Sequence, residues 1–310
     1  MVTSIWDDVK RAFAQGDNLT RLIIINIAFF LFVHVVGFLM VPFIGIGNHA
    51  AFNGFLEWFM APADPIELLK RPWTLITYMF LHEGLWHLVF NMLFLYWFGR
   101  IVQDLLGDHR IFPIYLLGGL VGFLAFFVSA NFLPGNISYF IGSHMLGASA
   151  GVMAIVMAAA TLAPTYIMHL LLIGPVQIRY IALFLILIDL IAIREGSNTG
   201  GHFAHLGGVF MGWYFIHLLR QGTDLSQPVN YLLNRISDFF SSLFSRRKRT
   251  PIRVRHNNSG AKRPITQQMP NANDPDYQKK LDRILDKIRE GGYESLTKEE
   301  KEFLFKASKQ

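Results

Sequence analysis

The order of apolar and polar positions divides the chain into long apolar stretches separated by polar breaks. Six stretches predict membrane-spanning helices; they cover residues 22–42, 82–103, 112–131, 148–163, 178–194 and 202–219. Residues 166–173 are also apolar, but Pro164 and Gly174 flank them, which predicts a short interfacial turn or hairpin. Residues 1–17 are amphipathic and predict a helix on the membrane surface. The predicted fold class is an all-α polytopic membrane protein, a six-helix bundle with a short helical tail.

The distribution of charge supports this interpretation. Residues 22–219 hold only 14 of the 50 charged side chains, too few for the surface of a soluble domain of that size. The tail that begins at Arg220 holds 19 of the 28 basic residues. The positive-inside rule therefore predicts that both termini are cytoplasmic, in a multi-pass protein of a bacterial inner membrane.

These patterns predict four segments. They are a cytoplasmic amphipathic segment over 1–21, the membrane domain over 22–219, a basic and largely disordered linker over 220–273, and a cytoplasmic helical hairpin over 274–310. Within the linker, the basic residues of 245–263 are expected to contact anionic lipid headgroups. In the hairpin, Thr297 and Glu300 form a capping-box pattern at the start of the second helix. Its cytosolic partner is unknown, and no nucleic acid is expected.

Polar residues gather at the starts of the second, fourth and sixth stretches. His87 and Asn91 lie in the second, Ser149 in the fourth and His205 in the sixth. All three stretches run in the same direction through the membrane, so these residues are expected at one depth near the outer face. Small residues predict a close contact between the fourth and sixth helices. They are Gly147, Gly151, Ala154 and Ala158 at the fourth stretch and Ala204, Gly208 and Gly212 in the sixth.

That contact would bring Ser149 within reach of His205, whose neutral imidazole can accept the serine proton. His87 and Asn91 are four residues apart and share a helix face. With the backbone N–H of Ser149, they are candidate donors to the negative oxygen of a tetrahedral intermediate. Cysteine is absent, which excludes disulfides, thiolate metal sites and a cysteine nucleophile. No cofactor and no metal are predicted.

The motifs His87-xxx-Asn91, Gly147-x-Ser149 and Ala204-His205-xx-Gly208-xxx-Gly212 together resemble those of the rhomboid intramembrane serine proteases. The resemblance covers roughly residues 70–216 and points to a bacterial member with a C-terminal extension. It implies a six-helix fold, a Ser149–His205 dyad without an acidic third member, and substrates that span the membrane. It also implies an oxyanion hole made by His87, Asn91 and the Ser149 amide. Trp73 and His82 stand where the family usually has a Trp and a His.

Three residues depart from the family pattern. Ala150 replaces a glycine, Thr74 stands where an arginine is frequent, and Met153 stands where some members have an aromatic residue. None of them removes a member of the dyad, so the resemblance implies an active protease.

Other interpretations of these residues remain open at this point. Asp189 is an acid deep in the fifth stretch; it is either a third catalytic member or the partner of Arg194 or of a backbone group, and the second reading is favoured. His82 and His87 are five apart, which does not match the His-Glu-x-x-His zinc motif. A catalytically silent rhomboid-like protein that binds client helices is the alternative function, and a transporter is a third.

Overall fold

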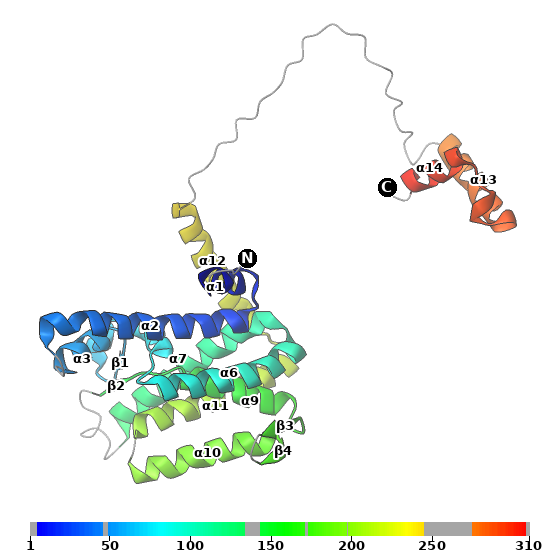
Figure 1. Ribbon diagram of the computed structural model, residues 1–310. Coiled ribbons are helices and arrows are strands. Elements are labelled where there is room, and N and C mark those ends of the chain that lie inside the picture. Colours follow the sequence, from blue (N-terminus) through cyan, green and yellow to red (C-terminus); the bar gives the residue numbers. More distant parts are fainter. Residues whose placement is uncertain are drawn as a thin grey trace, which may run out of the picture. The chain divides into compact units, whose positions relative to one another are not determined.

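The computed structural model describes residues 5–45, 49–133, 143–170, 173–196, 198–244 and 275–307, and Figure 1 shows their arrangement. The first half of the chain forms α1 (Ile5–Gln15), α2 (Asn18–Ile44), α3 (His49–Glu57), β1 (Ala61–Pro62), α4 (Pro65–Lys70), α5 (Thr74–Thr77), η1 (Tyr78–Phe80), α6 (Leu85–Leu106), η2 (Asp108–Arg110) and α7 (Ile111–Phe132). The second half forms β2 (His144–Met145), α9 (Ser149–Leu162), β3 (Ile167–Leu170), β4 (Gly174–Gln177), α10 (Ile178–Glu195), α11 (Thr199–Arg220), α12 (Ser226–Phe244), α13 (Pro275–Gly291), η3 (Tyr293–Ser295) and α14 (Lys298–Ala307).

Each of the six predicted apolar stretches coincides with a helix, namely α2, α6, α7, α9, α10 and α11. In the part of the chain that the structure describes, three helices are long and apolar enough to cross a membrane: α2, α6 and the helix that continues from η2 into α7. The apolar helix α9 is shorter. The chain is therefore a multi-pass membrane protein, while six crossings remain a prediction.

Local signals set several helix boundaries. The Asp17 side chain accepts a hydrogen bond from Thr20 N–H at 2.8 Å and caps the start of α2. Gly45, with φ of 85°, ends the same helix. The apolar residues around 166–173 form the antiparallel pair β3–β4, so the predicted hairpin is confirmed. The helix predicted at the N-terminus is present as α1, and its location on the membrane surface stays a prediction.

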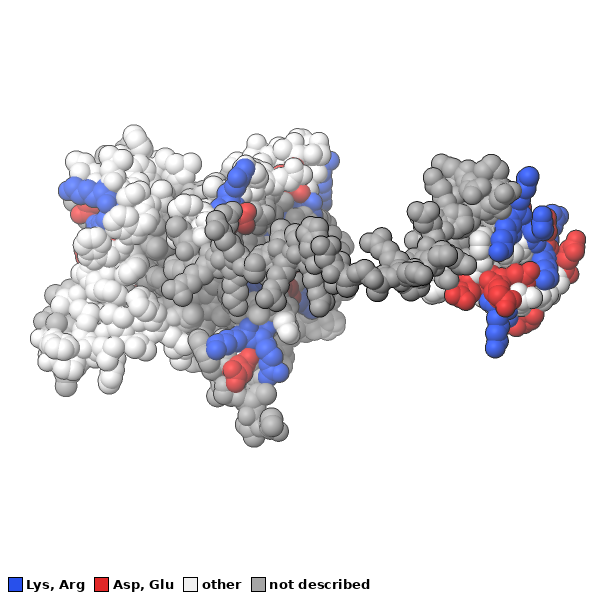
Figure 2. Space-filling view, turned by 90° about the horizontal axis from the view of Figure 1, so that it is seen from above, with Lys and Arg blue, Asp and Glu red and all other residues white. Residues whose placement is uncertain are grey.

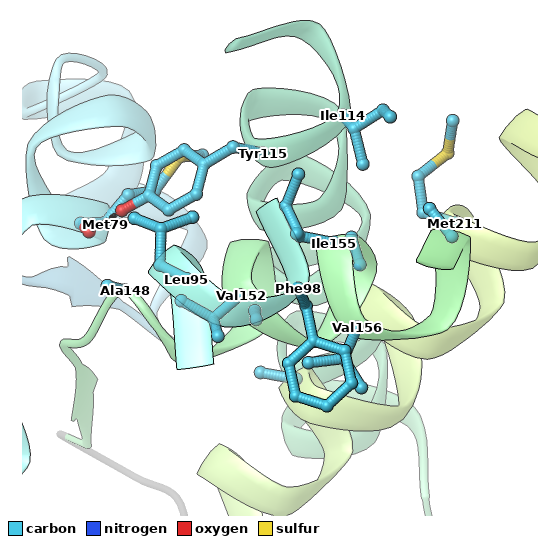
Figure 3. Close-up of a cluster of buried hydrophobic side chains, with 14 of the residues drawn as sticks. Met79, Leu95, Phe98, Ile114, Tyr115, Ala148, Val152, Ile155, Val156 and Met211 are labelled. Atoms are coloured by element: carbon cyan, nitrogen blue, oxygen red, sulfur yellow. Dashed lines mark hydrogen bonds between the residues drawn. The ribbon is translucent and has the colours of Figure 1, made fainter. Parts of the chain in front are cut away.

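The core of the bundle lies between α6, α7, α9 and α11. Figure 3 shows Leu95 and Phe98 from α6 and Ile114 from α7 among the side chains around α9, and all three are buried. Two tyrosines bridge to neighbouring backbone, since Tyr115 Oη donates to Met79 O and Tyr78 Oη donates to Gly119 O, both at 2.6 Å. These bonds satisfy buried hydroxyls that would otherwise be costly in the core.

The predicted linker over 220–273 is wrong in its first part, because residues 226–244 form α12. Exposed apolar residues recur at helical spacing there, at Leu232, Ile236 and Phe239, a periodicity that the high polarity of the segment concealed. The basic segment 245–263 lies outside the described residues.

The C-terminal residues form a separate compact unit. In it, Thr297 N–H donates to Glu300 Oε2 at 2.8 Å, and Glu300 N–H donates to Thr297 Oγ1 at 3.3 Å, so the capping box is confirmed. Figure 2 shows charges covering this unit, while the bundle is mostly uncharged on the face in view. The contrast follows the charge distribution along the sequence.

Candidate active site

Ser149 and His205 are in direct contact. Ser149 is the first residue of α9 and His205 lies two turns into α11, and the Ser149 Oγ to His205 Nε2 distance is 2.7 Å. That distance is a good hydrogen bond, and Ser149 Oγ can donate its proton to Nε2 in the tautomer of His205 that carries no proton there.

Asp189 is the residue on which the sequence interpretation fails. The favoured reading paired it with Arg194 or a backbone group, but its Oδ1 lies 2.8 Å from His205 Nδ1 and 2.6 Å from His202 Nδ1. Arg194 is five residues further along α10, about 140° around the helix, and it is exposed. The Asp189 side chain is only 6% exposed, so its carboxylate faces the two histidines.

The contact between α9 and α11 only partly uses the face of α9 that the sequence suggested. A Cβ atom at Gly208 would collide with the backbone oxygen of Ala150, and one at Gly212 would collide with that of Ala154. The atoms nearest to Gly151 belong to Tyr115 of α7. The prediction that Gly208 and Gly212 allow close approach is confirmed, and so is the part of Ala154; the other close neighbour is Ala150, where Gly151 was expected.

The same packing explains how Ala150 fits where the family has glycine. Its methyl group points at Gly122 of α7, where an added Cβ would lie 2.5 Å from the Ala150 Cβ. Space left by Gly122, rather than by Gly151, therefore accommodates the methyl group.

The predicted donors lie beside the serine. His87 and Ser149 both lie close to Gly147. A Cβ atom added to this glycine would be 3.3 Å from His87 Nε2 and 3.4 Å from Ser149 Oγ. Asn91 Nδ2 donates to the backbone oxygen of His87 at 2.9 Å, which uses one of its two N–H groups. The Ser149 amide is at a helix start, where N–H groups have no acceptor within the helix. His87, Asn91 and Ser149 all line the same cavity.

A cavity of about 400 Å³ opens onto these groups. Its lining includes the four predicted site residues together with Asp189, His202, Met153 and apolar side chains from α6 and α10. The cavity is large enough to admit a peptide segment and water. Met153 contributes an apolar wall, and the site therefore combines a nucleophile, a base and polar donors in one recess.

Asp189, His202 and His205 could also hold a metal ion, since one ligand atom from each lies within 4.8 Å of the others. In the described structure, those same atoms are joined by hydrogen bonds. His202 was not among the predicted site residues. Its position one turn before His205, on the same face of the helix, could have indicated that both side chains face the site.

The remaining predicted residues lie around the site. The Trp73 and Trp58 rings stack with 6.2 Å between centroids, and Thr74 is buried with its hydroxyl donating to Arg71 O at 2.6 Å. His82 precedes α6, and its ring packs edge-on against His87 at 5.3 Å. It therefore cannot form a helical zinc motif with His87.

The cavity thus brings together a half-buried serine, a half-buried histidine and a buried carboxylate in a helical bundle. In a comparison with known families, residues 69–222 match the Rhomboid domain family, so this part of the chain is similar to that family. Residues 271–310 match a second family, DUF6576, whose function is unknown.

Curated relatives carry the same domain name. The chain is 32% identical over 143 residues, 44% of its length, to the Arabidopsis thaliana protein "RHOMBOID-like protein 12, mitochondrial", and covers 43% of it. It is 32% identical over 174 residues, 56% of its length, to "RHOMBOID-like protein 6, mitochondrial" of the same plant, covering 50%. It is 28% identical over 138 residues, 44% of its length, to "Presenilin-associated rhomboid-like protein A, mitochondrial" of Danio rerio, covering 34%.

The chain thus spans half or less of the length of each of these three relatives. They are mitochondrial proteins by name, so the comparisons support the rhomboid domain and do not support the predicted bacterial origin.

Proposed function

We propose that this protein is an intramembrane serine endopeptidase that hydrolyses a peptide bond in or near the membrane-spanning segment of another protein. The 2.7 Å contact between Ser149 Oγ and His205 Nε2, inside a cavity that also holds His87 and Asn91, is the observation that carries the proposal. The match of residues 69–222 to the Rhomboid domain family supports it.

In the first step, Ser149 Oγ attacks the scissile carbonyl carbon and its proton moves to His205 Nε2. The carbonyl oxygen becomes an oxyanion, and His87, Asn91 and the Ser149 amide are the donors that stabilise it. One such donor is worth roughly 3–4 kcal/mol of transition-state stabilisation. His205 then gives its proton to the leaving amine, the C–N bond breaks, and an acyl-serine remains.

In the second step, a water molecule gives a proton to His205 and its oxygen attacks the acyl carbon. His205 then returns that proton to Ser149 Oγ as the C–O bond breaks, which releases the new carboxyl terminus and restores both side chains. Water reaches this step through the cavity. The substrate helix must unwind locally to expose its carbonyl, and in lipid every unpaired backbone group is costly. Helix-breaking or small residues near the cleaved bond are therefore expected in substrates.

Cleavage of a model membrane-spanning substrate in proteoliposomes tests this function. Ser149→Ala and His205→Ala are each expected to abolish cleavage while the protein remains folded. Ser242→Ala and His217→Ala are matched controls, because Ser242 is exposed on α12 and His217 lies at the far end of α11. Full activity in Ser149→Ala would overturn the mechanism. A wild type that binds the substrate without cutting it would favour the silent binding protein instead.

We also propose six membrane crossings with both termini on the cytoplasmic side of a bacterial inner membrane. The support is the excess of basic residues in the tail. The cysteine-free sequence allows a direct test with single cysteines at exposed sites on either side. A membrane-impermeant maleimide is expected to label Leu69→Cys, but not Gln221→Cys, in intact cells. The opposite pattern would reverse the topology.

The proposed partners are membrane-spanning substrate proteins and the lipid bilayer. The basic residues of 245–263 follow α12, whose exposed apolar side chains suit a membrane surface. Binding of the full chain to vesicles that contain phosphatidylserine, but not to neutral vesicles, would support this contact. Residues 274–310 are proposed to bind a cytosolic partner, which the sequence does not identify.

A further inference from the structure

Asp189 and the two histidines form a continuous chain of hydrogen bonds with the serine. Asp189 Oδ1 is 2.8 Å from His205 Nδ1, and His205 Nε2 is 2.7 Å from Ser149 Oγ. From this geometry we propose that Asp189 is a third member of the catalytic apparatus, a positioning residue that acts through His205. The inference rests on the proposed function and changes it from a dyad to a triad.

The first argument concerns the tautomer of His205. A carboxylate oxygen can only accept, so a hydrogen bond to Asp189 requires the proton of neutral His205 to be on Nδ1. Nε2 is then an acceptor, which is the form that can take the proton of Ser149. Without Asp189, both tautomers are accessible, and the one with its proton on Nε2 cannot act as the base.

The second argument concerns charge. When Ser149 attacks, its proton passes to His205, which becomes an imidazolium ion. Asp189 lies 2.8 Å from that ion in a site where its own side chain is only 6% exposed. Low exposure strengthens the attraction between opposite charges, so the carboxylate stabilises His205 at the moment when the cation forms.

His202 keeps the carboxylate in this role. Its Nδ1 lies 2.6 Å from the same oxygen, and its ring stands nearly perpendicular to that of His205, at 89°. With both imidazoles donating from Nδ1, the oxygen receives two N–H donors, which hold the carboxylate in this position. His202 therefore fixes the orientation of the Asp189 carboxylate, and Asp189 fixes the orientation of the His205 ring.

A purely structural role is the competing explanation, because Asp189 is one of three buried residues of α10 and ties that helix to α11. The two roles differ in their effect on pH dependence. The groups that face His205 are Ser149 of α9, Asp189 of α10, His202 of α11 and His87 of α6. Of these, Asp189 is the one that supplies a negative charge.

The kinetic test compares Asp189→Asn with Glu195→Gln, which removes an exposed carboxylate from the same helix. Asp189→Asn is expected to lower kcat on the order of 100-fold or more. It should also move the acid limb of the pH–activity profile to lower pH, because the imidazolium loses its anionic partner. Glu195→Gln should change neither. A kcat for Asp189→Asn within threefold of wild type, with an unmoved acid limb, would overturn the triad.

A second measurement does not depend on cleavage. In histidine-¹⁵N-labelled protein, His205→Ala identifies the resonances of His205, which are expected to show a proton on Nδ1. Asp189→Asn should remove that signal, whereas Glu195→Gln should not. If the wild type does not cleave but the signal behaves this way, the proposed function fails while the hydrogen-bond chain stands. A His205 with its proton on Nε2 in the wild type would overturn the triad whatever the activity.

Discussion

Gly208 is the position at which the packing of α9 on α11 controls the proposed chemistry. It lies three residues after His205, and its Cα faces the backbone of Ala150, the residue next to Ser149. In Gly208→Ala the new methyl group would overlap the Ala150 oxygen. Cβ atoms essentially never lie closer than 3.0 Å to such an atom, so we expect the two helices to separate by roughly 1 Å.

That separation is large on the scale of the active site. It would lengthen the Ser149 to His205 contact to about 3.7 Å, beyond hydrogen-bond distance. A 1 Å misplacement of reacting groups costs about 100-fold in rate, and overpacking costs roughly 1–3 kcal/mol of stability. We therefore expect kcat to fall about 100-fold in protein that is still folded.

The assay measures cleavage of a fluorogenic membrane-spanning peptide in proteoliposomes, together with the Tm of each variant. Gly54→Ala is the control, since a Cβ at this exposed position of α3 would meet no atom within 4 Å. It should leave kcat unchanged. A folded Gly208→Ala protein with wild-type kcat would refute the claim that this helix contact sets the catalytic distance.

Three further predictions follow from other contacts. Asn91→Ala removes a proposed oxyanion donor, so kcat should fall about 100-fold with little change in KM, as steady-state kinetics will show. Burial acts to raise the pKa of Asp224, but hydrogen bonds from Ser226 and Arg110 outweigh it and hold the pKa below its ordinary value. Asp224→Asn should therefore cost roughly 2 kcal/mol at pH 7. The difference in unfolding free energy should shrink as the pH falls from the ordinary carboxyl pKa through the lower pKa of folded Asp224. EDTA should leave cleavage unchanged, because hydrogen bonds engage the potential metal ligands; a loss that zinc restores would contradict this.

The positions of the helices could be predicted from the sequence because each is a long apolar run with clear polar ends. The pairing of Ser149 with His205 could also be predicted, because the small residues near them let the two helices approach closely. The rotation of α9 that decides which of its residues make this contact could not be predicted. Ala150 and Gly151 are both small, and which of them meets α11 depends on the rotation of α9 against α7, where the large Tyr115 ring packs on Gly151.

The partner of Asp189 could not be predicted for a related reason. An acid in an apolar helix needs a donor, and the sequence offers several, among them Arg194. The choice depends on how α10 rotates against α11, and in the structure that rotation directs Asp189 to His202 and His205. A helix with only three buried residues gives few sequence signals for its rotation.

The amphipathic helix α12 was missed because its apolar positions, including Ile236 and Phe239, are embedded among polar residues and precede a strongly basic segment. Average polarity indicated disorder, whereas the spacing of the apolar residues was already helical. Periodicity is the stronger signal in such a segment.

The central claim is that His205 activates Ser149 as a nucleophile. The most direct test is reaction of the membrane-embedded protein with a fluorophosphonate probe, followed by mass spectrometry of the labelled peptide. We predict one adduct, on Ser149, that is absent in Ser149→Ala and strongly reduced in His205→Ala but retained in His217→Ala. A wild-type protein whose Ser149 stays unlabelled, or is labelled equally well without His205, would contradict the account.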